Sequence, residues 1–313
     1  MQSKITRRRL LGAGAAAAAI GTTQAQPESA FWKSWSDGRA EVSSYDLTIP
    51  YGRELCQGVA LAIFAPDEFS SSDRVKAEPG RHPKADVFPV MKLNLIKEYQ
   101  TGISNRHEQT ASFLAFGSVN GRLPGSLTKA SFSRQDWEGA IYQQLLFDQK
   151  AIRSVLHSYR DGEGDQQKVL EFPISAISED SLWFWARQMA QPYVERGEYR
   201  LAPILVSMQS QRDTGQPIAI RQGKFTRSPV NQRIALPGGT FNVELCTVQI
   251  DASIRKFWVE REAPHRVIRW ETSEGEKGQL LASKHLKYWE MTGKGGEDRL
   301  KELKLLPRPV RTL

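Results

Sequence analysis

Apolar residues alternate with polar or small residues along much of the chain after residue 38, which is the pattern of strands with one buried face. Clear examples are the runs 59–63, in which Val and Leu alternate with Ala, and 91–95. Gly, Pro, Asn and Asp interrupt such runs at short intervals, as turns between strands do. Between Trp137 and Tyr159 the spacing fits either a helix or strands, and we predict strands. The pattern predicts a mainly β protein.

The last third of the chain carries two further strand signals. The apolar residues lie at odd positions over 241–245 and at even positions over 246–250, so we predict a bulge near Leu245. Apolar runs at 257–259 and 267–270 flank Pro264, which predicts a β-hairpin.

Two segments favour helix. Ser178 can cap the first, acidic residues follow it, and Pro192 ends it; its apolar face is formed by Leu182, Trp185, Ala186 and Met189. The second runs from Glu297 to Leu306, with leucines on one side and Pro307 after it.

These elements predict an antiparallel, two-lobed curved sheet or partly open barrel with one or two packed helices. After a signal peptide at 1–25, we place an N-terminal β lobe at 26–177 and a connecting helix at 178–192. A C-terminal β lobe with a terminal helix occupies 193–313.

The first 25 residues have the organisation of an export signal. Arg7 and Arg8 stand before an apolar stretch from Leu10 to Ile20, which is too short to span a bilayer, and the sequence 23–25 offers small residues for a signal peptidase. The arginine pair resembles the twin-arginine translocation (Tat) motif. We therefore expect the Tat translocon as partner during export, a periplasmic or other extracytoplasmic location, and no stable membrane span after cleavage.

Composition narrows the class of protein further. The 313 residues are 40% hydrophobic and 25% charged, which fits a globular chain with a sizeable core and excludes a multispanning or disordered one. The net charge is +8, but removal of four basic signal residues leaves 39 basic against 35 acidic residues, a net charge of +4. A nucleic-acid partner is therefore not expected.

Cys56 and Cys246 are the two cysteines of the chain, and both stand in apolar runs. In an oxidising compartment they could form one long-range disulfide; the alternative is two separate buried thiols. Neither has a nearby cysteine or histidine that would support thiol catalysis or zinc binding.

Motifs of catalysis and metal binding are incomplete throughout. The SxxK spacing at Ser126 and Lys129 lacks its companion elements, the acidic loop 161–165 lacks the remaining calcium ligands, and the five histidines show no ligand spacing. We predict no metal and no cofactor, and assign no catalytic residue.

Tryptophans are the other candidate feature, because an indole can stack on a sugar or line an apolar cavity. The more frequent role is in a core, which we favour for the tryptophans at positions 32, 35, 183, 185, 258, 270 and 289.

Several segments together resemble a family of uncharacterised exported bacterial proteins. They are the segments 35–45, 51–54, 91–94, 101–103, 133–139, 257–260 and 267–271. Similar sequences often carry the label septum formation inhibitor Maf, which implies a nucleotide pyrophosphatase fold of alternating strands and helices. The strand-rich pattern does not match that fold, so no Maf activity or residue is transferred to this chain.

Export, strand content and incomplete catalytic motifs together predict a non-catalytic cell-envelope protein that binds an apolar or glycan ligand in a β cradle. One alternative is an exported hydrolase with residues gathered from distant strands, which a perturbed carboxylate in a cleft would favour. Another is an envelope scaffold, marked by a large exposed apolar patch.

Overall fold

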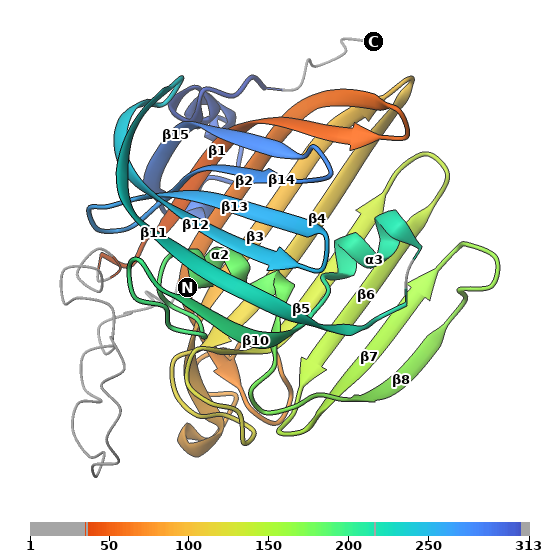
Figure 1. The fold of residues 1–313 in the computed structure, drawn as a ribbon. Coiled ribbons are helices and arrows are strands. Elements are labelled where there is room, and N and C mark those ends of the chain that lie inside the picture. Colours follow the sequence, from red (N-terminus) through yellow and green to blue (C-terminus); the bar gives the residue numbers. More distant parts are fainter. Residues whose placement is uncertain (1–34, 36, 216, 308–313) are drawn as a thin grey trace.

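A computed structural model describes residue 35 and residues 37–215 and 217–307. The predicted signal peptide, including Arg7 and Arg8, lies outside the described residues, as does Trp32. In the described part, fifteen strands form one sheet in which neighbours are antiparallel except for the pair β9 and β10 (Figure 1). Strands make up 56% and helices 11% of the structure, so the prediction of a mainly β, curved sheet is confirmed.

The first eight strands are β1 (Ala40–Tyr51), β2 (Glu54–Ser70), β3 (Val87–Thr101), β4 (Ser104–Ala115), β5 (Ser126–Gln135), β6 (Ala140–Phe147), β7 (Ala151–Ser158) and β8 (Gln166–Glu171). The others are β9 (Ile177–Ser178), β10 (Tyr199–Leu205), β11 (Ile220–Leu236), β12 (Gly239–Ile250), β13 (Ser253–Glu260), β14 (Val267–Thr272) and β15 (Lys277–Leu286). The helical elements are η1 (Lys84–Asp86), η2 (Glu179–Ser181), α2 (Leu182–Ala186), α3 (Met208–Thr214), η3 (Tyr288–Glu290) and η4 (Gly296–Leu303).

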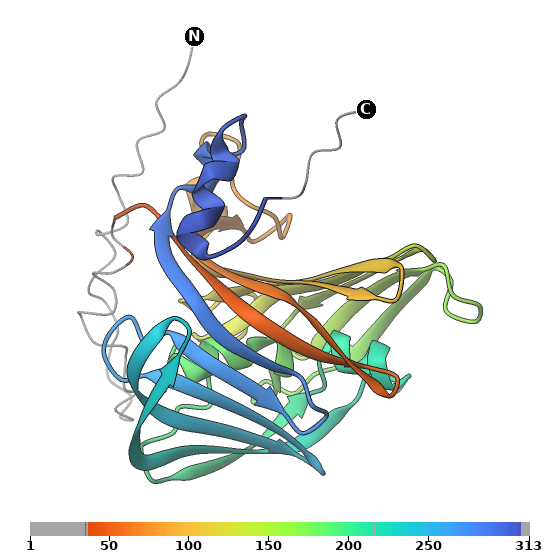
Figure 2. The same cartoon turned by 90° about the horizontal axis from the view of Figure 1, so that it is seen from above.

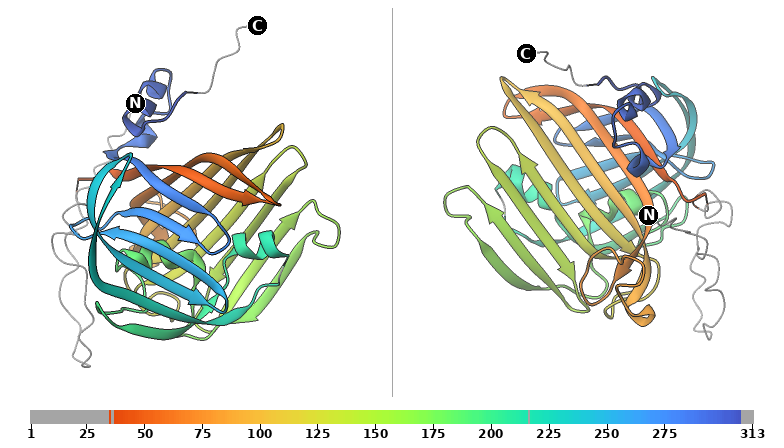
Figure 3. Two further views of the ribbon diagram at one scale, coloured as in Figure 1. Left: turned by 45° about the horizontal axis from the view of Figure 1, so that its top comes forward. Right: turned by 180° about the vertical axis from the view of Figure 1, so that it is seen from behind.

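The sheet is continuous because β1 pairs with β2 on one side and with β15 on the other. Its edges are β8 and β9, which do not pair with each other, so the sheet does not close into a barrel. The strands β3 to β8 and the strands β10 to β14 curve toward each other and leave a concave side between them (Figures 1 and 3).

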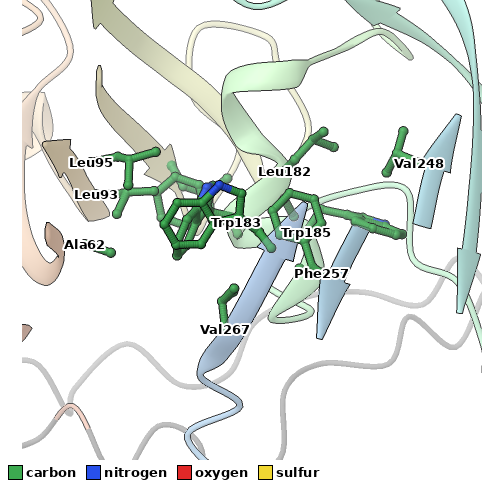
Figure 4. Packing of buried hydrophobic residues seen from close by; sticks show 14 of the residues in the cluster. Ala62, Leu93, Leu95, Leu182, Trp183, Trp185, Val248, Phe257 and Val267 are labelled. Carbon is green, nitrogen blue, oxygen red and sulfur yellow. The ribbon is translucent and has the colours of Figure 1, made fainter. Parts of the chain in front are cut away.

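Helix α2 fills part of this concave side. All five of its residues are apolar and buried, as expected for a helix that is apolar on every face. Trp183 packs against Phe257 on β13 and Trp185 against Phe225 on β11, within the same cluster as Leu93 on β3 (Figure 4). The segment between β9 and β10 therefore supplies the centre of the core that joins the two halves of the sheet.

The helix predicted from Ser178 starts where expected but is shorter. The Ser178 side chain accepts a hydrogen bond from the backbone N–H of Asp180, as a cap does. The helix ends at Ala186, and Gln188 has a φ of 63°, a left-handed conformation that an α-helix cannot continue through.

Arg187, the residue after α2, is fully buried and anchors the segment. Its guanidinium donates two hydrogen bonds of 2.8 Å to the two carboxylate oxygens of Glu41 on β1, and a third of 2.8 Å to the carbonyl of Pro264. It also lies 4.3 Å from the ring centroid of Phe64. The concave-side segment is thus joined to β1 and to the turn between β13 and β14.

Strand β2 is covered on both faces, whereas its alternation predicted one buried face. Ala60 and Ala62 face the main core, and Ile63 belongs to a smaller cluster with Leu303 of η4. This second cover is the predicted C-terminal helix, which forms as a 3-10 helix on the outer side of the sheet (Figure 2).

The strand pairing agrees with two further local predictions and differs from a third. The segment between Trp137 and Tyr159 contains strands β6 and β7, and β13 and β14 form the expected hairpin. The irregularity expected near Leu245 lies in the partner strand: the register shifts between Arg227 and Asn231 of β11, opposite Leu245. The extra residues are therefore accommodated on β11, while β12 pairs regularly with β13.

Cys56 on β2 and Cys246 on β12 are buried free thiols in this structure. Burial raises the pKa of the Cys246 thiol, which lowers its reactivity in the folded protein. We expect two alkylated cysteines when the protein is unfolded without reductant and treated with iodoacetamide, with slow labelling before unfolding. An unlabelled intact mass under denaturing conditions would instead establish the disulfide.

Candidate functional site

A cleft of about 880 Å³ lies on the concave side of the sheet, next to α2. Residues of β3, β4 and β5 form one wall, and residues of β12, β13 and β14 form the other. Residues of helix α3 and its flanking loops, from 206 to 219 apart from the undescribed position 216, also line the cleft. Figure 1 shows α3 on the concave side of the sheet. Tips of the β1–β2, β12–β13 and β14–β15 hairpins line it at one end of the sheet.

The apolar part of the cleft is mainly aromatic. The ring centroid of Trp183 lies 5.1 Å from that of Trp270 and 6.2 Å from that of Phe257, in edge-to-face arrangements. Trp270 packs over Gly278 of the neighbouring strand, where an added Cβ would stand 1.9 Å from the ring. This close approach requires glycine at 278 and fixes the position of the Trp270 ring.

The polar part of the cleft contains a buried ion pair that joins its two walls. The Lys97 ammonium on β3 donates to both carboxylate oxygens of Glu276, at 2.7 and 2.8 Å. Trp270 Nε1 donates to the same carboxylate at 2.9 Å, and Gln209 on α3 contacts both partners. Burial alone would raise the pKa of Glu276, but Lys97 and these hydrogen bonds hold it below its ordinary value.

A second buried network also pairs a cation with carboxylates from other elements. Arg134 on β5 donates to Glu108 on β4 at 2.7 Å and to Asp213 on α3. The Tyr99 hydroxyl donates to Glu108 at 2.6 Å. Burial and this carboxylate raise the pKa of Tyr99, so the phenol remains protonated and acts as a donor.

Glu179 and Asp180 hold α3 in place over the cleft. Glu179 accepts hydrogen bonds from the Ser207 backbone N–H at 2.8 Å and from Arg255 Nε at 2.6 Å. Asp180 accepts from the Ser178 hydroxyl at 3.0 Å and from the backbone N–H of Met208, the first residue of α3. Burial, with repulsion from Glu179, raises the pKa of Asp180 to about 7.

The raised pKa gives Asp180 a defined effect on stability. Because the folded protein keeps this proton up to about pH 7 and the unfolded chain loses it near the ordinary value of 3.8, Asp180 makes the free energy of unfolding fall as pH rises between those values. Asparagine has the same shape and cannot ionise. We therefore expect Asp180→Asn to become progressively more stable relative to wild type from pH 4.5 to pH 7.5, measured by urea unfolding. A stability difference that does not change over that range would contradict the assignment.

Of the residues that the sequence singled out, Trp183 and Trp270 meet at the cleft, whereas the cysteines and histidines do not. Cys56, Cys246 and all five histidines are absent from its lining, and the described residues contain no cluster of three or more His, Cys, Asp or Glu suited to a metal. Glu163 and Asp165 of the acidic loop pair with Arg212 and His157. Most of the cleft's ion pairs were missed by sequence reasoning, since their members are far apart in the chain.

The tryptophans of the described residues differ in their exposure. Those at positions 35, 183, 185 and 270 are buried, as expected for core residues, and those at 258 and 289 are half-buried. Trp137, which the sequence analysis did not consider as a ligand platform, is 69% exposed. Its position between Asp136 and Glu138-Gly139, a typical turn sequence, is the signal that could have identified it.

Comparison with known proteins gives one structural similarity. No protein family and no curated protein matches the chain. The fold is similar to the crystal structure of a beta-barrel-like protein of Domain of Unknown Function DUF1849 from Brucella abortus, with a TM-score of 0.45 and 10% sequence identity. The similarity covers 80% of this chain and 98% of that chain.

None of the helices in the described residues combines the length and the apolar character needed to cross a bilayer.

Proposed function

We propose that the mature protein is an exported, non-catalytic binding protein of the cell envelope, which holds an amphipathic small molecule in the concave cleft. The observation that carries this proposal is the combination of an aromatic wall with buried, internally neutralised ion pairs in a cleft of about 880 Å³. That volume lies within the range of roughly 300–1,000 Å³ that small-molecule sites occupy.

The charges of the cleft support an amphipathic ligand over a strongly charged one. Lys97 is paired with Glu276, Arg134 with Glu108, and Arg255 with Glu179. Because each of these three cations already has a carboxylate partner, a ligand does not need to bring a counter-charge to them. Apolar groups of a ligand can pack on Trp183 and Phe257, while its polar groups exchange hydrogen bonds with the paired side chains.

Export is tested separately from binding. Replacing Arg7, Arg8 and Arg9 together with lysine should leave the uncleaved precursor in the cytoplasm, because the twin-arginine motif requires arginine. Cell fractionation with an antibody against the protein measures this. Unchanged export of the triple variant would reject the Tat pathway.

Binding is tested with the fluorescent apolar probe N-phenyl-1-naphthylamine. Ala219 is half-buried and lines the cleft, so Ala219→Trp should fill part of it and weaken probe binding at least tenfold. Ala235→Trp is the matched control, because Ala235 is exposed on β11 and outside the cleft lining. Equal probe binding by wild type and both variants would contradict binding in the cleft.

A hydrolase is the second candidate, favoured by Asp180, a buried carboxylate with a pKa near 7 in the cleft lining. The bonds from Ser178 and Met208 give that carboxylate a structural role instead, at the start of α3. Turnover of nitrophenyl ester or glycoside substrates by pure wild-type protein, lost in Asp180→Asn, would favour the hydrolase.

A further inference from the structure

A second, smaller pocket of about 380 Å³, which we call the rim pocket, lies between the tips of three consecutive hairpins. Its lining comes from the β1–β2, β3–β4 and β5–β6 tips and consists of Tyr51, Glu54, Thr101, Gly102, Ile103, Ser104, Arg106, Trp137 and Glu138. We propose that the rim pocket binds a neutral or amino sugar ring of a glycan, with Trp137 as the stacking platform. This site is separate from the proposed ligand site in the cleft, although the two share Tyr51, Arg106 and Glu138.

Trp137 is the aromatic feature on which this inference rests. Its side chain is 69% exposed, and a large apolar side chain kept in water at a pocket is more typical of a binding residue than of a core residue. The face of an indole ring is electron-rich and attracts the weakly positive C–H groups on one face of a sugar. Ile103, 77% exposed on the neighbouring tip, adds apolar surface to the same pocket.

The turn that carries Trp137 is fixed before any ligand binds. The Asp136 carboxylate accepts hydrogen bonds from the backbone N–H groups of Glu138 and Gly139, at 2.9 and 3.2 Å. Arg106 forms a buried ion pair of 3.2 Å with the same carboxylate and donates to the Tyr51 hydroxyl at 2.9 Å. A platform held in this way loses little conformational entropy on binding.

The polar groups of the rim pocket indicate which sugars it accepts. Arg106 is neutralised by Asp136, which leaves Glu54 and Glu138 as the uncompensated charges; within the described residues, neither forms an ion pair. Glu138 accepts one hydrogen bond of 3.0 Å, from the Tyr159 hydroxyl. Two carboxylates and the hydroxyls of Thr101 and Ser104 can bind sugar hydroxyl or amino groups, and the carboxylates repel acidic sugars.

The same charges make a bilayer the less suitable partner for these hairpin tips. Exposed tryptophan and isoleucine are also found at membrane interfaces. Here, however, Glu54 and Glu138 stand beside them, and neither forms an ion pair within the described residues. Carboxylates are costly to desolvate and are repelled by anionic lipid headgroups.

The test is saturation-transfer NMR of the folded mature chain with four probes: triacetylchitotriose, maltotriose, glucosamine trimer and trigalacturonic acid. We expect saturable binding of at least one neutral trimer, weak or absent binding of the acidic trimer, and at least a tenfold loss of affinity in Trp137→Ala. Tyr199→Ala, a 60% exposed aromatic on β10, is the matched control and should bind as wild type does. The double variant Glu54→Gln, Glu138→Gln should bind the acidic trimer more tightly than the wild type does, because it lacks the two carboxylates that repel it.

Three outcomes would overturn the inference. The first is the absence of saturable binding for both neutral trimers and for glucosamine trimer. The second is equal sugar binding by Trp137→Ala and the wild type. The third is that no sugar binds and the protein sediments with phosphatidylcholine–phosphatidylglycerol vesicles in a way that requires Trp137. Ala219→Trp should leave sugar binding unchanged, so failure of the rim pocket and failure of the cleft proposal can be told apart.

Discussion

Replacing Arg187 with methionine should lower the free energy of unfolding by about 3–5 kcal/mol, which is the usual cost of removing one partner of a buried ion pair. Arg187 is fully buried, and its partner Glu41 is 2% exposed. Without the guanidinium, the Glu41 carboxylate remains buried next to an apolar side chain, and the carbonyl of Pro264 loses a donor. Urea unfolding followed by tryptophan fluorescence measures the effect.

The double variant Arg187→Met, Glu41→Leu distinguishes the effect of an unpaired buried charge on stability from the effect of the changed side-chain shape. Because it removes both charges, it should recover at least half of the lost stability. The surface pair Arg299 and Glu302 provides a control, since Glu302→Gln should change stability far less than Arg187→Met does. A single Arg187→Met change that costs less than 1 kcal/mol would contradict the anchoring role of Arg187.

Trp183→Ala should destabilise the protein by about 3–5 kcal/mol, as large-to-small changes of buried aromatics do. Trp183 packs edge-to-face against Tyr45, Trp270 and Phe257, which come from β1, β14 and β13. Its removal leaves a cavity at the junction of both halves of the sheet and enlarges the cleft. The measurement is the midpoint of urea unfolding, together with the slope of the transition.

Trp137→Ala is the matched control for that variant, because it removes the same side chain from an exposed position. It should alter stability by no more than about 0.5–1 kcal/mol. Similar losses for the two variants would show that the contacts of Trp183 do not stabilise the core as described here.

The β elements were predictable because their signals are local. The hairpin of β13 and β14 follows from two apolar runs around Pro264, and the all-apolar stretch 182–186 could be stable only in a core. The second cover on β2 was not predictable from the strand alone, since η4, which supplies Leu303, lies more than 200 residues later.

The cleft was beyond sequence reasoning for the same reason. Lys97 and Glu276 are separated by 179 residues and meet because β1 pairs with β15 in the middle of the sheet. Nothing in the local sequence of either residue distinguishes it from an exposed charge. Asp180 was expected as an acid in the first turn of a helix; the structure places its carboxylate at the start of α3.

Native mass spectrometry of the mature protein purified from its own cell envelope tests the central claim most directly. The account predicts a discrete additional mass of one amphipathic molecule on wild type and on Ala235→Trp, and a much reduced fraction of that mass on Ala219→Trp. Identical occupancy in all three proteins, or only the bare chain in each, would contradict a ligand in the concave cleft.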